Sequence, residues 1–178
     1  MISQHLPILQ IVLPLLAAPV CIFIRHPKAV WIWSVVITWM CLPMSIELLV
    51  RVLDSGTIVY ELGSWAAPWG IEYRVDTLNA FVLVIVSSIS TVVMPFARKT
   101  VEREIPANRI YLFYTMLLLC MTGLLGITIT GDAFNLFVFL EISSLSTYVL
   151  ISFGKDRRAL TAAYRYLIMG TIGATFYI

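Results

Sequence analysis

Glu141 is the residue in this chain whose type and position could do chemistry, because it is the lone acid in the apolar stretch Ala133 to Phe153. At about 1.5 Å of rise per residue, it lies close to the middle of a membrane-spanning helix, near the bilayer centre. An unpaired charge at that depth costs roughly 2.5–3.5 kcal/mol on insertion scales. The position predicts a residue that handles an ion or a proton; a neutral, hydrogen-bonded structural glutamate is the alternative.

Other polar side chains on the same helix could support this acid. Ser144 and Tyr148 follow Glu141 at spacings that bring them to its side of a helix. A cation that approaches and withdraws would make such an acid hold and release a proton. Further side chains that could hydrogen-bond a carboxyl group or hold water around it are Asn135, Ser143, Ser146 and Thr147.

Two other acids have simpler explanations. Asp132 follows Gly131 at the start of the same helix, where a carboxylate accepts hydrogen bonds from free backbone N–H groups and opposes the positive helix end. We prefer capping for Asp132 and keep a supporting role in transport as the alternative. Glu47 lies four residues before Arg51 near the end of an apolar stretch, so a surface ion pair accounts for it.

The composition identifies the class of protein in which these residues work. Hydrophobic residues make up 60% of the 178 residues, charged residues make up 12%, and the mean hydropathy is +0.93, which is too apolar for a soluble domain. Six stretches are long enough to cross a bilayer as helices, and they lack the alternation of barrel strands. We therefore predict an all-α polytopic membrane protein with one membrane domain, 1–178. Its expected helices are approximately 6–24, 29–50, 77–97, 109–130, 132–153 and 158–178.

The segment 52–76, between the second and third helices, has a different pattern. Apolar side chains recur at every second position from Ile58 to Leu62 and again from Ile71 to Val75. This pattern predicts a small extracytoplasmic β-hairpin, which we expect to rest on helix ends or on a neighbouring subunit, since two strands are marginally stable alone. Near the lipid headgroups its turn would hold Trp65, Pro68 and Trp69.

The basic residues predict the orientation of the chain, because cytoplasmic loops collect Lys and Arg. Only Arg51 and Arg74 fall on the opposite side. We therefore expect a multi-pass protein of the inner (plasma) membrane with an extracytoplasmic N-terminus. No basic residue precedes Arg25, which argues against a cleaved signal peptide. On the predicted cytoplasmic side lie Arg25, Lys28, Arg98, Lys99, Arg103, Arg109, Lys155, Arg157 and Arg158, with Arg165 just inside.

The sequence contains no recognisable catalytic, cofactor or metal motif. Cys21, Cys41 and Cys120 lie apart in apolar stretches, where they are best explained as small packing residues. No glycine-rich nucleotide motif and no Ser/His/Asp arrangement occurs, and the scattered basic residues do not form a nucleic-acid surface. We expect no cofactor, no nucleic-acid partner and no enzymatic activity in the chain itself, although it could belong to a redox-driven complex.

One run of residues resembles a known family. Thr130 to Glu141, TGDAFNLFVFLE, resembles the fifth helix of antiporter-like membrane subunits, and above all that of the D-type subunit of Mrp cation/proton antiporters. The wider family includes the proton-pumping membrane subunits of respiratory complex I and of membrane-bound hydrogenases. Ala162 to Gly170 resembles the family's sixth helix, and an outside hairpin before helix three is typical of its architecture. The resemblance covers the whole chain as the N-terminal part of a longer subunit.

The resemblance implies a role for Glu141. It matches the family's essential helix-five glutamate, which pairs with a lysine on helix seven and takes part in proton translocation. Family members have about fourteen helices in two inverted repeats, whereas this chain stops at its sixth helix without that lysine. Lys155 lies in a loop. Arg165 would lie about five turns from the depth of Glu141 on an antiparallel helix, where it could line a cytoplasmic entry route.

Several interpretations of this departure stay open: a natural split subunit, a shortened subunit, or a fragment. The leading hypothesis is a proton-translocating half-subunit of a multi-subunit cation/proton antiporter, in which a partner chain supplies the missing lysine helices. The alternative is a structural membrane subunit of a complex I- or hydrogenase-like respiratory complex with no transport site of its own. A self-contained small-solute carrier is disfavoured because the six spans contain no internal repeat. The expected partners are other membrane subunits, the lipid bilayer and protons, with sodium left open as a coupling ion.

Overall fold

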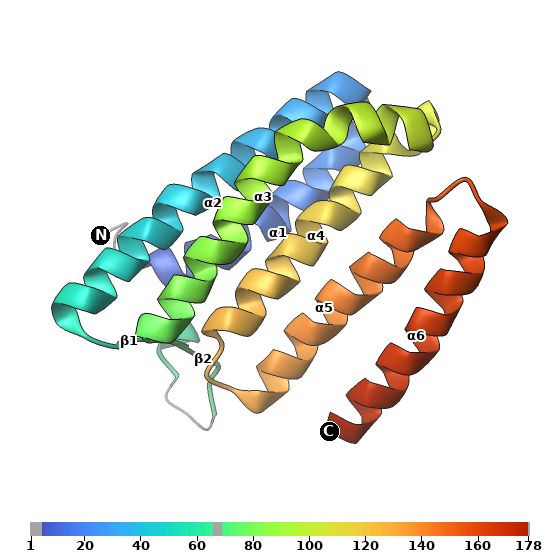
Figure 1. Ribbon diagram of the computed structural model, residues 1–178. Helices are drawn as coiled ribbons and strands as arrows, with labels where there is room; N and C mark the ends of the chain where they lie inside the picture. Colours follow the sequence, from blue (N-terminus) through green and yellow to red (C-terminus); the bar gives the residue numbers. More distant parts are fainter. Residues whose placement is uncertain (1–4, 66–68, 178) are drawn as a thin grey trace.

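The apolar runs form six helices in the computed structural model, which describes residues 5–65 and 69–177 (Figure 1). Among these residues, five helices are long and apolar enough to cross a membrane. The sixth, α6, has a lower hydropathy because it begins with two arginines and carries Arg165. The helices are α1 (Leu6–Ile24), α2 (Pro27–Ser55), α3 (Thr77–Glu104), α4 (Ile110–Ile129), α5 (Ala133–Ser152) and α6 (Arg157–Tyr177).

Local sequence signals explain where these helices begin. Proline lies in the first turn of α1 and of α2, where its missing N–H has no helical partner to lose. Carboxylates cap two later helices: Asp76 accepts a hydrogen bond of 2.8 Å from the backbone N–H of Asn79 at the start of α3, and Asp132 does the same for α5. The capping interpretation of Asp132 is therefore confirmed.

The first four helices form a bundle, and α5 and α6 extend it on one side (Figure 1). α1 packs against both α2 and α4, α2 packs against α3, and α5 lies between α4 and α6. Two apolar clusters fill the bundle, one near the hairpin around Leu83 and Leu125 and one toward the opposite end around Val30 and Leu118. This arrangement leaves α6 at the edge of the bundle, beside the helix that carries Glu141.

The all-helical fold with a small hairpin agrees with the sequence-based prediction. β1 (Ile58–Glu61) and β2 (Glu72–Val75) pair antiparallel, with Ile58 opposite Val75. The strands are shorter than the alternation predicted: Leu62 begins a 3-10 turn, η2 (Leu62–Ser64), although its N–H still donates to the Ile71 carbonyl over 2.9 Å. Of the three predicted turn residues, Trp65 and Trp69 are exposed, and Pro68 lies outside the described residues. The expected end of the sixth helix at Ile178 lies outside them too.

The hairpin rests on the ends of α4 and α5, as expected for two strands that are marginal alone. The backbone of Tyr73 forms a β-bridge with Thr130, and the Gly131 N–H donates to the Glu72 carbonyl over 2.9 Å. The Tyr73 side chain is buried, and its ring lies 6.4 Å from that of Phe139 on α5. The hairpin thereby holds the short connection that leads into α5.

The predicted surface pair of acid and base on α2 is present. The Arg51 guanidinium and the Glu47 carboxylate lie 2.8 Å apart, with both side chains partly exposed. An exposed pair one turn apart contributes a few tenths of a kcal/mol, about 0.3–0.5, to a helix. Glu47 is thus explained by local structure, which leaves Glu141 as the acid of the spans that needs an explanation.

Candidate functional site

Two glycines of α4 allow α5 to approach closely. A Cβ added at Gly123 would lie 2.6 Å from the backbone nitrogen of Ser143 and 2.8 Å from the carbonyl oxygen of Phe139. The Phe139 ring lies against Gly126 in the same way. Small residues are the usual means of close helix packing in membranes. The face of α5 that holds Phe139 and Ser143 is therefore pressed against α4. Neither glycine is among the residues predicted from the sequence, although their spacing of three residues was a signal.

Glu141 lies on the other side of α5. At 100° per residue, Phe139 and Ser143 are each about 160° from Glu141 around the helix axis. Its side chain is half-buried by this chain alone. Within the described part of the chain, no hydrogen bond or ion pair reaches its carboxylate. The acid therefore lies midway along α5 and is turned away from α4.

The hydroxyl and amide groups of α5 that could hydrogen-bond the Glu141 carboxyl group have other partners among the described residues. The Ser146 and Thr147 hydroxyls donate to carbonyl oxygens of their own helix, over 2.7 and 2.8 Å. The Asn135 amide donates to the Thr130 hydroxyl at the start of α5. These groups lie toward α4 because that interface buries the same face of the helix as Ser143. Periodicity alone could not reveal which face α4 would take.

Tyr148 shares the Glu141 side of α5, about two turns away. Its buried ring meets Tyr166 of α6 edge-on with the ring centroids 5.1 Å apart, and its hydroxyl lies against Gly170. Ser144 is half-buried, and its side-chain hydroxyl forms no hydrogen bond within the described residues. Both predicted supporting residues are therefore on the side of α5 that carries Glu141, and Tyr148 joins that side to α6.

Arg165 lies nearer to the level of Glu141 than the sequence estimate of five turns. α5 and α6 run antiparallel side by side (Figure 1), with Tyr148 beside Tyr166 and the Tyr177 hydroxyl donating to the Ala133 carbonyl. With the two helices aligned by these contacts, Arg165 lies roughly two helical turns from the level of Glu141 along the axis. Arg165 is exposed and lies on a different face of α6 from Tyr166 and Gly170. The structure therefore does not bring Arg165 and Glu141 together.

Asp132 is also distant from Glu141, at about 13 Å along the helix axis. Its carboxylate accepts a hydrogen bond from the Asn135 N–H over 2.9 Å. Nearby in the hairpin, burial raises the pKa of the Tyr73 phenol above its ordinary value, and a hydrogen bond with the Asn135 side chain opposes this shift. This end of α5 is thus a capped and packed junction.

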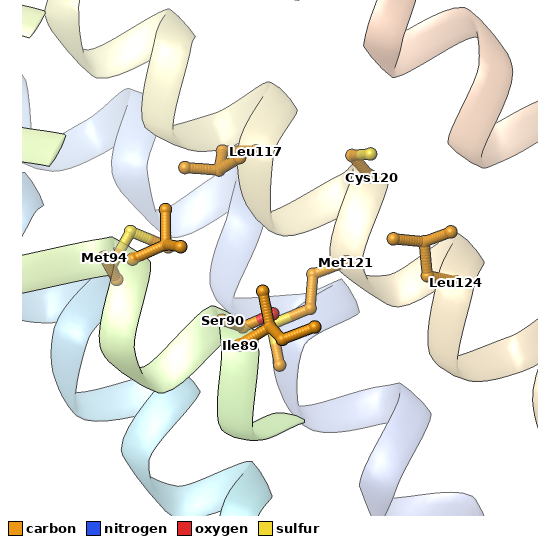
Figure 2. A pocket seen from close by; sticks show the side chains of 8 residues that line it. Ile89, Ser90, Met94, Leu117, Cys120, Met121 and Leu124 are labelled. Carbon is orange, nitrogen blue, oxygen red and sulfur yellow. The ribbon is translucent and has the colours of Figure 1, made fainter. Parts of the chain in front are cut away.

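A pocket between α3 and α4 lies apart from these residues. It has a volume of about 120 Å³ and is lined by apolar side chains, among them Met94 of α3 and Leu117 and Met121 of α4 (Figure 2). Apart from Ser90 and Cys120 its lining residues are apolar, and no charged residue is among them. Its chemistry suits an apolar group, so we place the candidate site on α5 rather than here.

Relatives of known type match almost the whole chain. It is 36% identical to the N subunit of NADH-quinone oxidoreductase from Desulforudis audaxviator and 31% identical to the D-type subunit of a Na(+)/H(+) antiporter from Alkalihalophilus pseudofirmus. The homologues of the chain are therefore subunits of these two kinds. The two alignments cover 99% and 98% of this chain but 35% of each relative, so the chain spans about a third of the length of the relatives it matches. No protein-family model matches the chain.

Solved structures agree with this assignment. A chain of the membrane-bound sulfane sulfur reductase, an archaeal respiratory membrane complex, superposes with a TM-score of 0.88 at 29% identity, covering 97% of the present chain and 35% of that chain. A chain of the Mrp complex from Dietzia sp. DQ12-45-1b gives a TM-score of 0.86 at 23% identity, over 98% and 33%, which shows the shared fold. The present chain is a multi-pass membrane protein, and its relatives are subunits of multi-subunit membrane complexes.

Proposed function

We propose that this chain is the N-terminal part of an antiporter-like subunit that translocates protons within a multi-subunit cation/proton antiporter. Glu141 is the carboxylate that carries the proton. The similarity to the D-type subunit of a Na(+)/H(+) antiporter and to a chain of an Mrp complex supports this function. The coupling cation is left open, because one carboxylate can serve protons or sodium.

The observation that carries the proposal is the position of Glu141. It lies midway along a spanning helix, half-buried and turned away from α4, and no described residue pairs with its carboxylate. A carboxylate at that depth requires a partner or a proton. Since the chain spans about a third of its relatives' length, the remaining helices, with a lysine among them, come from sequence outside these residues or from a partner subunit.

Four residues are assigned supporting roles. Ser144 and Tyr148 share the Glu141 side of α5, where their hydroxyl groups can hydrogen-bond water along the proton path. Asp132 fixes the start of α5. Arg165 adds a positive charge on the cytoplasmic side of the path, where it attracts anionic groups of a partner chain and disfavours stray cations.

The setting of the chain follows from the same proposal. Residues 1–178 form one membrane domain in the inner (plasma) membrane with an extracytoplasmic N-terminus, because the connections rich in Lys and Arg are cytoplasmic. The chain is not itself an enzyme, and any redox chemistry belongs to other subunits. Its partners are other membrane subunits of the antiporter.

A structural role in a respiratory complex is the alternative. It is favoured by the similarity to the N subunit of an NADH-quinone oxidoreductase and to a chain of an archaeal respiratory membrane complex. In that case Glu141 is a neutral hydrogen-bonding residue at an interface between subunits. Its replacement would then impair assembly and would not change the transport rate of complexes that do assemble.

A measurement of cation/proton exchange in membrane vesicles that contain the assembled complex distinguishes the two functions. Glu141→Gln keeps the shape of the side chain and cannot carry a proton, so we expect cation/proton exchange to be lost while the chain and its partners assemble in normal amounts. Glu141→Asp should retain part of the activity. The matched control is Glu47→Gln, which removes the acid of an exposed pair and should leave exchange intact. Normal exchange by assembled Glu141→Gln complexes would refute the proposal.

A further inference from the structure

A second pocket lies where the α3–α4 and α5–α6 connections meet, at the end of the bundle that collects the basic residues. It has a volume of about 470 Å³. We call it the loop pocket and define it by its basic residues Arg109, Lys155 and Arg157 and its apolar residues Phe153 and Leu160. None of these residues takes part in the site on α5.

The charges of the loop pocket favour an anion. Asp156 is its one acid, and its carboxylate accepts a hydrogen bond of 3.0 Å from the Arg158 N–H, so it is engaged in starting α6. The Lys155 ammonium donates to the Arg103 carbonyl at the end of α3, which ties the two connections together. Three positive charges against one negative charge leave the pocket with a net positive charge.

Two of its cations have no counter-charge. Arg109 and Arg157 are exposed, and no ion pair or hydrogen bond of their side chains occurs among the described residues. They approach the pocket from different connections, Arg109 from the start of α4 and Arg157 from the start of α6. A guanidinium group matches the oxygen geometry of a phosphate and can bind it through two parallel hydrogen bonds.

The apolar residues of the loop pocket distinguish a lipid from a free ion. Phe153 is half-buried at the end of α5, and the Leu160 side chain is 59% exposed on the first turn of α6. Phe153 directly follows the spanning helix α5, and Leu160 lies near the start of α6. A small hydrated anion gains nothing from them, whereas an acyl chain gains about 0.8 kcal/mol per buried CH₂ group.

We propose that the loop pocket binds the headgroup of an anionic phospholipid, with Arg109 and Arg157 on its phosphate and Phe153 and Leu160 beside its acyl chain. The bound lipid joins the start of α6 to the start of α4 and thereby holds α6, which packs mainly on α5, against the bundle. Basic pockets of this kind between spanning helices are known lipid sites. The proposal concerns binding and does not depend on proton transport.

Lipid titration of the full chain, purified with its membrane partners in mild detergent, tests the proposal. Phosphatidylglycerol and phosphatidylcholine are added separately, and the bound lipid is counted by native mass spectrometry. We expect phosphatidylglycerol to be retained in preference to phosphatidylcholine. In Arg109→Gln/Arg157→Gln, each lost charge should weaken binding about fivefold, giving about 25-fold for the pair. Arg109→Lys/Arg157→Lys keeps the charge and should recover part of the affinity, which controls for misfolding.

Two comparisons decide whether the pocket itself is responsible. Lys28→Gln/Lys99→Gln removes two charges from the same membrane face outside the loop pocket and should leave phosphatidylglycerol binding within twofold of the parent chain. Inorganic phosphate in excess should fail to displace the lipid. The proposal is overturned if Arg109→Gln/Arg157→Gln binds phosphatidylglycerol as tightly as the parent chain does. It is also overturned if Lys28→Gln/Lys99→Gln loses as much affinity as that variant, or if free phosphate displaces the lipid completely.

Discussion

Gly170 of α6 lies so close to the Tyr148 hydroxyl of α5 that a Cβ at position 170 would overlap with the phenol oxygen. The same tyrosine ring meets Tyr166 edge-on. These contacts fix the pairing of α5 with α6 on the side of α5 that carries Glu141. A glycine of the neighbouring helix therefore sets how closely α6 approaches this side of α5.

The first prediction concerns that glycine. Gly170→Ala forces Tyr148 or the α6 backbone to move, and overpacking of this kind costs roughly 1–3 kcal/mol. We expect a lower midpoint of thermal unfolding in detergent, followed by intrinsic tryptophan fluorescence. Gly173→Ala is the matched control on the same helix, because nothing lies within 4 Å of a Cβ at that position. Equal midpoints for the two variants would show that the Tyr148 contact does not hold α6.

The second prediction separates capping from charge at Asp132. Asp132→Ala removes the hydrogen bond to the Asn135 N–H and should cost about 1 kcal/mol of stability, again seen as a lower unfolding midpoint. Asp132→Asn keeps a capping oxygen and should unfold close to the parent. If Asp132→Asn is stable but loses exchange activity, the carboxylate charge itself takes part in transport and capping is not its whole role.

The third prediction is a pH dependence of stability at the hairpin. Burial raises the pKa of Tyr73 above its ordinary value of 10, so the unfolded chain gives up this proton at a lower pH than the folded chain does. The stability that Tyr73 contributes is complete below pH 10 and is lost as the pH rises through the folded-state pKa. Tyr73→Phe should therefore show a smaller fall in unfolding midpoint above pH 10. Identical pH profiles for parent and variant would rule out Tyr73 as a cause of alkaline destabilisation.

The fourth prediction addresses Arg165. Its side chain is exposed and has no ion pair among the described residues, so Arg165→Gln should leave the free energy of unfolding within about 0.5 kcal/mol of the parent. If it supports the proton path, exchange by the assembled complex should nevertheless fall several-fold. Arg158→Gln at the start of the same helix is the control and should retain normal exchange. An unchanged rate for Arg165→Gln would remove it from the proposed path.

Much of the fold follows from the sequence because bilayer length and apolar runs constrain helices strongly. The start of α5 at Asp132, the pair Glu47 and Arg51 and the hairpin around Tyr73 are local patterns, and the structure contains all of them. The resemblance of the run ending at Glu141 also anticipated the homology found for the whole chain.

The remaining features depend on contacts between helices, which a periodic pattern does not encode. The spacing of Gly123 and Gly126 did not show that α4 would take the face of α5 that holds Ser143. On that side of the helix, the Ser146 and Thr147 hydroxyls donate to carbonyl oxygens of α5 itself. The distance from Glu141 to Arg165 was overestimated for a similar reason, since it depends on how α5 and α6 are aligned.

Chemical modification of Glu141 in the assembled complex tests the central claim most directly, because it needs no mutant that could fail to assemble. Membrane vesicles are treated with a hydrophobic carbodiimide, the modified fraction of Glu141 is measured by peptide mass spectrometry, and cation/proton exchange is recorded on the same sample. We predict that exchange falls in proportion to the modified fraction. Full exchange with Glu141 completely modified would contradict its role as the proton carrier.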